Sequence, residues 1–404
     1  MLLARLLDKI VQTGRLTLVD PLGRTRTFGA NHGPAVTMRV HDRATARRLA
    51  LRPKLAFGES YMDGTLTVEN GSLYDLLELL AINIQRYEDM PLARAMSRAG
   101  MLVRHRQQAN HVRRSRRNVA HHYDLSGRLY DLFLDKDRQY SCAYFTNNNK
   151  TLDEAQHDKK RHIASKLLFT KPGMKVLDIG SGWGGLGLYL ARVAQADVTG
   201  ITLSTEQLKV SNDRARAEGL AERARFELRD YRQEKGRYDR VVSVGMFEHV
   251  GARHYRAFFR KLKALLKDDG VALLHSIGRM APPGTTNPWL RKYIFPGGYT
   301  PALSETIAAI EQEGLWVTDI EILRIHYADT LREWRRRFQE NRAEIARLYD
   351  ERFCRMWEFY LAGCEVAFRR MDQMVFQIQL AKRQDAVPLT RDYMLDWERA
   401  NMSA

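Results

Sequence analysis

The chain has little cysteine, and its cysteines are not spaced to hold a metal or a disulfide framework. Its 404 residues include three cysteines, Cys142, Cys354 and Cys364, and no two of them form a C-x-x-C pair. A zinc cluster or a disulfide scaffold needs such pairs or a larger, even set. We therefore expect no metal site and a protein that works in a reducing compartment.

Long hydrophobic runs are also missing. No stretch of about 18 apolar residues occurs, which excludes a typical transmembrane helix. The opening stretch MLLARLLDKI is interrupted by Arg5, Asp8 and Lys9, and it is too short for a secretion signal. We expect a cytoplasmic protein.

Acidic residues are outnumbered by basic ones. The chain has 65 Lys and Arg against 48 Asp and Glu, which gives a formal net charge of +17. Residues 101–120, MLVRHRQQANHVRRSRRNVA, contain six arginines and no acid. Such a surface suits a polyanionic partner, either a nucleic acid or an anionic lipid leaflet. A basic, solvated surface without a partner fits the same composition, so charge alone leaves three interpretations open.

The length predicts two domains, since single cores rarely grow beyond about 250–300 residues. In residues 1–100, Leu3, Leu7 and Ile10 follow helical spacing, and RLTLVD and AVTMRV alternate as strands do. This region predicts a small α+β domain, or a helical one with a hairpin, and we expect it to associate with lipid or membrane. We expect a basic linker over 101–120 and a catalytic domain over 121–404.

From about residue 170, strands and helices alternate, which is typical of a parallel, doubly wound (Rossmann-like) α/β sheet. Helices are predicted at LSTEQLKVSNDRARAEGL and HYRAFFRKLKALLK, with a long, mostly helical insertion over about 328–370. The predicted strands are KVLDIG, DVTGIT, ARFELR, DRVVSVGM, GVALLHSI, WVTDIEI and MVFQIQLA.

The loop Gly180–Gly185, GSGWGG, follows the first of these strands with the G-x-G-x-x-G spacing of a nucleotide-binding turn. Asp178 precedes the glycines, and its charge disfavours a pyrophosphate and suits a cationic ligand. S-adenosylmethionine carries an ammonium and a sulfonium group. Thr202 stands where NAD enzymes carry a ribose-binding acid, with Glu206 a helical turn later, and Asp230 is placed to accept from an adenine amine. These residues favour S-adenosylmethionine over NAD.

The substrate class needs a further signal. A base-modifying nucleic-acid methyltransferase usually has a D/N-P-P-Y/F turn after its fourth strand, where a flipped base stacks. This chain has MFEHVG there, and its only proline pair, Pro282–Pro283, follows the fifth strand. The pattern disfavours a nucleic-acid substrate and leaves a small-molecule C- or N-methyltransferase open as an alternative.

Several short stretches together resemble the cyclopropane-fatty-acyl-phospholipid synthase family, which includes the mycolic acid cyclopropane synthases. They are YSCAYF, VLDIGSGWGGL, ITLSTEQ, VVSVGMFEHVG, LLHSIG and KYIFPGG. The likeness covers about residues 118–385, and FGESYMDGTL resembles the N-terminal domain of longer bacterial members. It implies transfer of a methylene group from S-adenosylmethionine to the cis double bond of an unsaturated phospholipid acyl chain, with bound bicarbonate as the general base. A methyl-branched or methylene fatty acid is the alternative product within the family.

The resemblance also implies the site residues. The residues expected to hold bicarbonate are Cys142, Glu248, His275, Ile277 and Tyr327. Taken singly, Glu248 could cap a helix, and His275 or Tyr327 could be core residues. Cys364 matches a cysteine proposed as a nucleophile in the family, but on an apolar helix a buried structural thiol is the stronger interpretation. The expected cofactor-binding residues are Tyr140, Ser141, Val176, Leu177, Asp178, Ile179, Gly180, Ser181, Gly182, Trp183, Gly184, Thr202, Leu203, Ser204, Thr205, Glu206, Gln207, Asp230, Tyr231 and Arg232.

The charge, the linker and the resemblance together predict an enzyme that works as a peripheral protein at the inner face of a membrane. Its partners would be unsaturated phospholipid acyl chains and an anionic membrane surface, with no nucleic acid. We expect a homodimer, because two copies would place two basic surfaces on one membrane.

Overall fold

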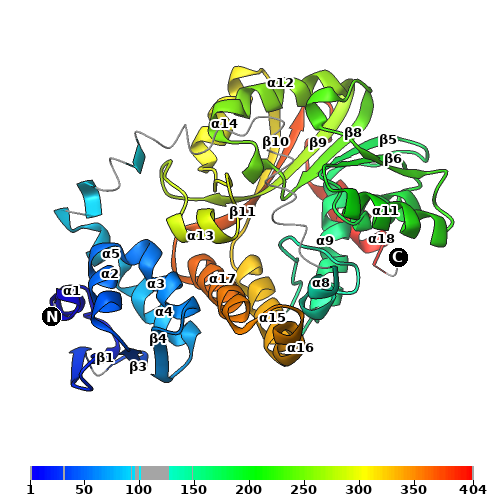
Figure 1. The fold of residues 1–404 in the computed structure, drawn as a ribbon. Coiled ribbons are helices and arrows are strands. Elements are labelled where there is room, and N and C mark those ends of the chain that lie inside the picture. Colours follow the sequence, from blue (N-terminus) through cyan, green and yellow to red (C-terminus); the bar gives the residue numbers. More distant parts are fainter. Residues whose placement is uncertain are drawn as a thin grey trace. The chain divides into compact units, whose positions relative to one another are not determined.

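The computed structural model describes residues 2–30, 32–91, 93–95, 100–101, 127–147 and 149–402 (Figure 1). The basic linker expected over 101–120 lies outside the described residues, apart from Met101. Contacts divide the chain into two compact units. The first draws on the described parts of Met1–Arg104, Thr285–Pro296 and Leu331–Gln373, and the second on those of His105–Gly284, Gly297–Thr330 and Met374–Ala404.

The first unit contains a four-stranded sheet with the order β2-β1-β3-β4. β1 pairs antiparallel with β2 and parallel with β3, and β4 pairs antiparallel with β3. The buried face of the sheet forms one core with the apolar face of the first helix. This region is therefore an α+β domain, which settles the alternative left open by its sequence. Its elements are α1 (Leu2–Ile10), β1 (Arg15–Val19), β2 (Thr25–Gly29), β3 (Ala35–Val40), α2 (Arg43–Leu51), α3 (Pro53–Met62), β4 (Leu66–Asn70), α4 (Leu73–Ile82) and α5 (Ile84–Glu88).

The helical insertion predicted over 328–370 is confirmed, and most of it belongs to the first unit. It consists of α15 (His326–Glu340), α16 (Arg342–Leu348) and α17 (Glu351–Arg370). Within this unit α17 packs against α3 and α4. The Tyr61 hydroxyl donates to Glu358 Oε2 at 3.1 Å. A further short helix of the unit, α13 (Pro288–Tyr293), packs against α3.

The second unit contains a seven-stranded sheet with the order β10-β11-β9-β8-β5-β6-β7. All seven predicted strands are confirmed. The sheet is mixed, because the last strand, β11, runs antiparallel to β10, whereas β5 to β9 pair in parallel. The strands are β5 (Lys175–Ile179), β6 (Asp197–Thr202), β7 (Ala224–Leu228), β8 (Tyr238–Val244), β9 (Leu266–Arg279), β10 (Trp316–Leu323) and β11 (Gln373–Ala381).

Both faces of this sheet are covered, which explains why its inner strands β5, β8, β9 and β11 are buried over most of their length. Val176 packs into a core with α9 and α10, whereas Leu177 packs into a second core with α12 and α14. The described helices of this unit are α8 (Gly127–Phe133), α9 (Leu152–Lys166), α10 (Gly185–Val193), α11 (Thr205–Ala217), α12 (Tyr255–Leu265), α14 (Leu303–Gln312) and α18 (Asp392–Ala400). Within the described residues, none of the helices has the length and apolar character needed to cross a bilayer.

The chain leaves β5 for β6 on one side and later returns to β8 on the other side. In a doubly wound sheet such a switch opens a crevice at the carboxyl ends of the strands. The functional site is therefore expected beyond Ile179, Thr202 and Val244, the last residues of these three strands.

Candidate active site

The glycine loop joins β5 directly to α10, and its conformation requires glycine. Gly180 has φ +85°, and a Cβ there would lie 3.0 Å from Met246 Cβ. The loop is pinned to the neighbouring strand, because the amides of Gly180 and Ser181 both donate to the Ile201 carbonyl, at 2.9 and 3.0 Å. A ligand can therefore approach the backbone of this turn without meeting side chains.

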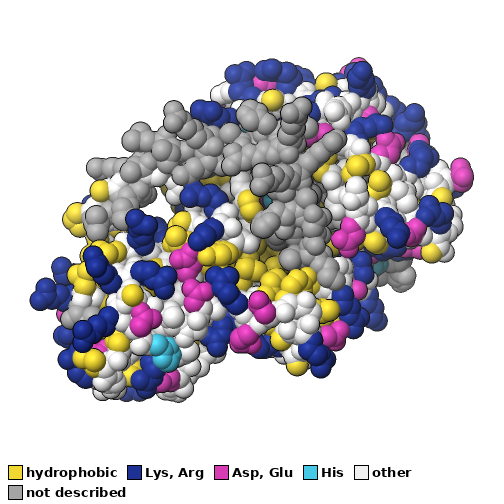
Figure 2. All heavy atoms as spheres, viewed as in Figure 1, with side chains coloured by type: hydrophobic (Ala, Val, Ile, Leu, Met, Phe, Trp, Pro, Cys, Tyr) yellow, Lys and Arg dark blue, Asp and Glu magenta, His cyan; other side chains and the backbone are white. Residues whose placement is uncertain are grey.

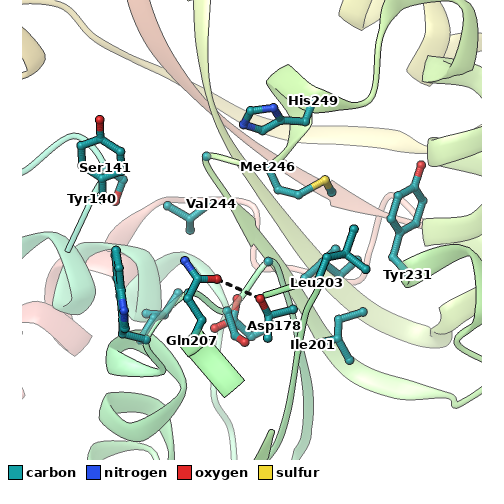
Figure 3. A pocket seen from close by; sticks show the side chains of 18 of the residues that line it. Tyr140, Ser141, Asp178, Ile201, Leu203, Gln207, Tyr231, Val244, Met246 and His249 are labelled. Carbon is teal, nitrogen blue, oxygen red and sulfur yellow. Dashed lines mark hydrogen bonds between the residues drawn. The ribbon is translucent and has the colours of Figure 1, made fainter. Parts of the chain in front are cut away.

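A pocket opens at the expected end of the sheet. Figure 3 shows Tyr140 and Ser141 on one side of it and Tyr231 on the opposite side, with Asp178 and Gln207 below. The predicted cofactor residues that line it are Tyr140, Ser141, Asp178, Ile179, Gly180, Ser181, Gly182, Trp183, Thr202, Leu203, Gln207, Asp230, Tyr231 and Arg232.

The other predicted cofactor residues lie behind this lining. Val176 and Leu177 are buried inside β5. Ser204 caps α11, since its side chain accepts from the Gln207 amide, and Thr205 and Glu206 form the first turn of that helix. Gly184 precedes α10, where a Cβ would lie 2.8 Å from Ser211 Cβ.

The lining also includes residues that the sequence did not predict: Arg138, Gln139, Leu186, Ile201, Arg229, Val244, Gly245, Met246, His249 and Val250. The segment from Val244 to Val250 follows the carboxyl end of β8, and that position alone could have identified it. Arg138 and Gln139 carried no comparable signal, because their place in the pocket depends on long-range packing of the loop after α8.

Asp178 places a buried carboxyl group in the wall of the pocket. The residue is 2% exposed, and its Oδ2 has no hydrogen-bond partner among the described residues. Burial raises the pKa of Asp178 to about 7, although the nearby charge of Lys159 acts to lower it. An unpaired carboxylate oxygen in a pocket wall is costly unless a ligand donates to it. The pocket therefore fits a ligand that carries an ammonium group or another strong donor.

Asp230 and Thr202 are already engaged within the chain. Asp230 accepts from Arg232 Nε at 2.8 Å and from Arg232 Nη2 at 2.6 Å. The Thr202 hydroxyl donates to Gln207 Oε1 at 2.8 Å, as the dashed line in Figure 3 shows. The adenine contact expected for Asp230 stays a prediction, and such a ligand would have to share a carboxylate that Arg232 holds in place.

Glu248 and Ile277, two of the residues expected to bind bicarbonate, are in direct contact. Glu248 lies on the 3₁₀ turn Phe247–His249, and its Oε1 accepts from the Ile277 amide at 2.7 Å. Its Oε2 has no hydrogen-bond partner of good geometry in the described part of the chain. Burial raises the pKa of Glu248 to about 7. The carboxyl can therefore carry a proton near neutral pH and donate it to an anion.

Replacing Glu248 with glutamine should stabilise the ligand-free protein above neutral pH. Between the ordinary pKa of 4.5 and the folded-state value of about 7, the folded chain keeps a proton that the unfolded chain releases. Stability from this group is therefore lost as the pH rises through that window. In denaturant unfolding, we expect the free energy of unfolding of Glu248→Gln to exceed that of the parent by about 1–3 kcal/mol at pH 8 and to match it near pH 4.5. Equal stability at pH 8 would mean that the folded carboxyl ionises without cost.

His275 lies two residues before Ile277 on β9 and is buried. Its Nδ1 is 3.1 Å from Gln377 Nε2. Burial, together with the charges of Lys159 and Lys166, lowers its pKa well below the ordinary value, so the ring is neutral. The His275 carbonyl accepts from the amide of Gly245, a pocket-lining residue, at 3.0 Å.

Cys142 and Tyr327 lie on segments that are bonded to each other. The Ala143 amide donates to Thr330 Oγ1 at 3.0 Å, and the Phe145 amide donates to His326 Nδ1, also at 3.0 Å. Both Cys142 and Tyr327 are buried. Burial raises the pKa of the Cys142 thiol far above its usual range, so this cysteine is a thiol rather than a thiolate.

A buried lysine that the sequence did not predict connects these groups. Lys159 on α9 donates to Gln139 Oε1 at 2.5 Å and to Ser141 Oγ at 2.9 Å, and both partners line the pocket. Burial lowers its pKa to about 8. Its charge acts on Asp178, Cys142 and His275, lowering the pKa of each. One cation is therefore close to both the pocket and the candidate base site.

Cys364 belongs to the other compact unit, on α17. Burial raises the pKa of its thiol to about 12. A reactive cysteine needs a lowered pKa, so this environment is that of a structural thiol.

Comparison with known proteins agrees with this geometry. The model of the family described as mycolic acid cyclopropane synthetase matches residues 110–378. The cyclopropane-fatty-acyl-phospholipid synthase of Escherichia coli K12 is 36% identical over 352 residues, which cover 87% of this chain and 89% of the relative. The tuberculostearic acid methyltransferase UfaA1 of Mycobacterium tuberculosis is 37% identical over 391 residues, which cover 94% and 90%.

A solved structure gives the same result for the catalytic fold. The mycolic acid cyclopropane synthase CmaA1, complexed with SAH and CTAB, superposes with a TM-score of 0.62 at 34% identity, covering 66% of this chain and 97% of that one. The family match spans most of the chain, and the seven-stranded sheet is of the methyltransferase type. The protein therefore belongs to the mycolic acid cyclopropane synthetase family of S-adenosylmethionine-dependent methyltransferases.

Proposed function

We propose that this protein transfers a methylene group from S-adenosylmethionine to the cis double bond of an unsaturated phospholipid acyl chain and forms a cyclopropane fatty acid. One observation carries the proposal. The end of β8 and the turn after it line the pocket through Val244–Met246 and through His249 and Val250. Between them, Glu248 binds the Ile277 amide, and its second oxygen has no hydrogen-bond partner among the residues that the structure describes. This arrangement supports a cofactor pocket and a small polar site for an anion on the same turn.

The pocket offers what S-adenosylmethionine requires. Asp178 would receive a donor of the cofactor through its unpaired Oδ2, and the glycine loop would approach the ligand with its backbone. Tyr140, Trp183 and Tyr231 line the pocket with aromatic rings, which attract a sulfonium as they do other cations. When bound, the cofactor supplies an electrophilic methyl group.

The chemistry then defines what the remaining residues do. The alkene carbon forms a bond to the methyl carbon as the carbon–sulfur bond breaks, and a carbocation results. The ring closes when the former methyl group loses a proton to a base. Bicarbonate would serve as that base, held by Glu248, the Ile277 amide and His275 together with Cys142 and Tyr327. The buried Glu248 carboxyl, with its pKa raised to about 7, can donate to such an anion instead of repelling it.

The product can be tested in cells that make no cyclopropane lipids. Expression of this chain should yield acyl chains that gain one CH2 with the unsaturation count retained and no reactive alkene. Acyl chains that gain CH2 plus two hydrogens would overturn the cyclopropane proposal in favour of a methyl branch.

A methyl-branched or methylene product is the second candidate. The relative that covers 94% of this chain is named a tuberculostearic acid methyltransferase, so the same fold is compatible with a methyltransferase outcome. The difference would arise after the carbocation has formed. A cyclopropane and a methylene product would both lose a proton from the new methyl group, whereas a methyl branch would need loss of a proton followed by reduction with an external hydride donor.

Replacing Cys364 with serine should leave turnover within about twofold, because a thiol whose pKa is raised to about 12 is neither nucleophile nor base at neutral pH. The rate is measured with phospholipid vesicles and S-adenosylmethionine. A loss of more than about a hundredfold in a folded variant that still binds S-adenosylmethionine would assign chemistry to this residue.

We also propose that the protein binds the anionic face of a membrane, with the first 100 residues taking part. Lys and Arg side chains are spread over the face seen in Figure 2, and the formal net charge is +17. Binding to anionic vesicles should weaken at least about tenfold between low and high salt, since ions screen surface charges. Sedimentation with neutral vesicles is the control. Equal binding to both kinds of vesicle at high salt would remove the electrostatic part of the proposal.

A further inference from the structure

A chain of buried polar side chains leads from His275 to the surface of the second unit. His275 Nδ1 lies 3.1 Å from Gln377 Nε2 on β11, and Gln377 Oε1 lies 2.6 Å from Lys166 Nζ on α9. Lys166 also binds Glu321 Oε2 on β10. The side chains of His275, Gln377 and Lys166 are buried, and none of the four residues in this hydrogen-bonded series lines the cofactor pocket.

Lys166 determines which groups donate and which accept along this series of hydrogen bonds. Its ammonium group has three donors and no acceptor. The Gln377 atom beside it must therefore be the amide oxygen, and the NH2 group of Gln377 must face His275. An amide NH2 group only donates, so His275 Nδ1 must accept, and it must carry a lone pair.

Lys166 is charged because it forms an ion pair with Glu321 at the outer end of this hydrogen-bonded series. Burial lowers the pKa of Lys166, and the neighbouring Glu321 carboxylate acts in the opposite direction. Burial alone would raise the pKa of Glu321, but hydrogen bonds from His162 and Lys166 lower it to about 2. The Glu321 side chain is 33% exposed, so the ion pair reaches solvent at this end.

We propose that Lys166 and Gln377 are positioning residues that hold His275 in the tautomer with its single proton on Nε2. The chain of hydrogen bonds runs in one direction: the ammonium group donates to the amide oxygen, and the amide NH2 donates to Nδ1. The consequence for catalysis rests on the proposed function: Nε2–H is then the one donor that the neutral ring offers to a bound anion. A ring with its proton on Nδ1 would present a lone pair to that anion and repel it.

The tautomer can be measured directly by NMR in the full-length protein with ¹³C,¹⁵N-labelled histidine. The chain has 12 histidines, and a His275→Gln spectrum identifies the signals of His275 by difference. We expect Nδ1 to show the shift of an unprotonated ring nitrogen and Nε2 that of a protonated one. A wild-type ring protonated on Nδ1 would overturn the proposal.

Gln377→Glu replaces the amide NH2 group that donates to His275 Nδ1 with a carboxylate oxygen, which can only accept. The variant should move the ring proton from Nε2 to Nδ1 and lower kcat at least about tenfold, with the KM for S-adenosylmethionine unchanged. The matched control is Gln379→Glu. Gln379 is equally buried two residues along β11, where it binds the Lys166 carbonyl at 2.6 Å and the Tyr393 hydroxyl at 2.7 Å, and its hydrogen bonds do not involve His275.

The outcomes separate this proposal from the proposed function. A Gln377→Glu ring that keeps the wild-type shifts, or a Gln379→Glu ring that changes as much, overturns the tautomer proposal. Lys166→Met provides a second variant, in which the amide can turn and His275 should show a mixture of tautomers. Failure of the proposed function would instead appear as absence of a lipid product from a wild-type chain whose His275 signals are as expected.

Discussion

A chain carrying both Glu248→Gln and His275→Ala is expected to turn over phospholipid at least about a thousandfold more slowly than the parent. Both residues belong to the proposed base site, and neither lines the cofactor pocket. Without the His275 ring, an anion would have lost a donor, and an amide at position 248 cannot exchange a proton with it as the Glu248 carboxyl can, so the carbocation would have no base in place. The measurement is kcat on vesicles of unsaturated phospholipid at saturating S-adenosylmethionine.

Binding of S-adenosylmethionine by the double variant is the control for folding. Its affinity for S-adenosylmethionine should stay within about threefold of the parent, since the pocket-lining residues are intact. Glu248→Gln alone should unfold no more easily than the parent at pH 8. Turnover at the parental rate would contradict the assignment of Glu248 and His275 to the reaction.

Asp178→Asn is expected to weaken binding of S-adenosylmethionine by about 10- to 100-fold, measured by titration calorimetry at pH 8. The carboxylate oxygen that has no hydrogen-bond partner among the described residues is the group that a cationic donor would use, and a charge-assisted hydrogen bond contributes about 1.5–3 kcal/mol. The residue's raised pKa, about 7, adds a pH dependence. Below pH 7 the carboxyl is protonated and can no longer attract a cation, so the affinity of the parent should fall with the pH, whereas that of the variant should not.

A second buried aspartate gives the matched control. Asp319 on β10 is buried and pairs with Arg391 at 2.5 Å, and it does not line the pocket. Asp319→Asn should therefore leave the affinity for S-adenosylmethionine within about twofold, although it removes the same charge. Equal losses in both variants would show that Asp178 acts only through the net charge of the protein.

Local patterns predicted most of the catalytic sheet and the centre of its pocket. The run KVLDI followed by GSGWGG specifies a buried strand and a turn that only glycine permits, and the structure has both. Asp178 could be identified because its position relative to the glycines is set by the strand itself. Glu248, His275 and Ile277 required the resemblance to the family, since each of these residues taken singly fits an ordinary core or capping role.

Features that depend on distant segments were not predictable. The strand TRTFG has one buried residue in five, so it shows no alternation, and β2 was missed. Lys159 lies in a helix with several other basic residues, and nothing local distinguishes it from them. Its role depends on the packing of that helix against the segment that carries Gln139 and Ser141. The pairing of α17 with α3 and α4 likewise joins residues about 300 positions apart, such as Tyr61 and Glu358.

The most direct test of the proposed chemistry uses S-adenosylmethionine with a fully deuterated methyl group, the purified protein and vesicles of unsaturated phospholipid. Ring closure after loss of one deuteron to the base predicts a product whose new carbon keeps two deuterons, and the product made with unlabelled cofactor should show the high-field NMR signals of a cyclopropane. A product that keeps all three deuterons would mean that no proton is taken from the transferred methyl group. That result would contradict the base site proposed around Glu248, Ile277 and His275.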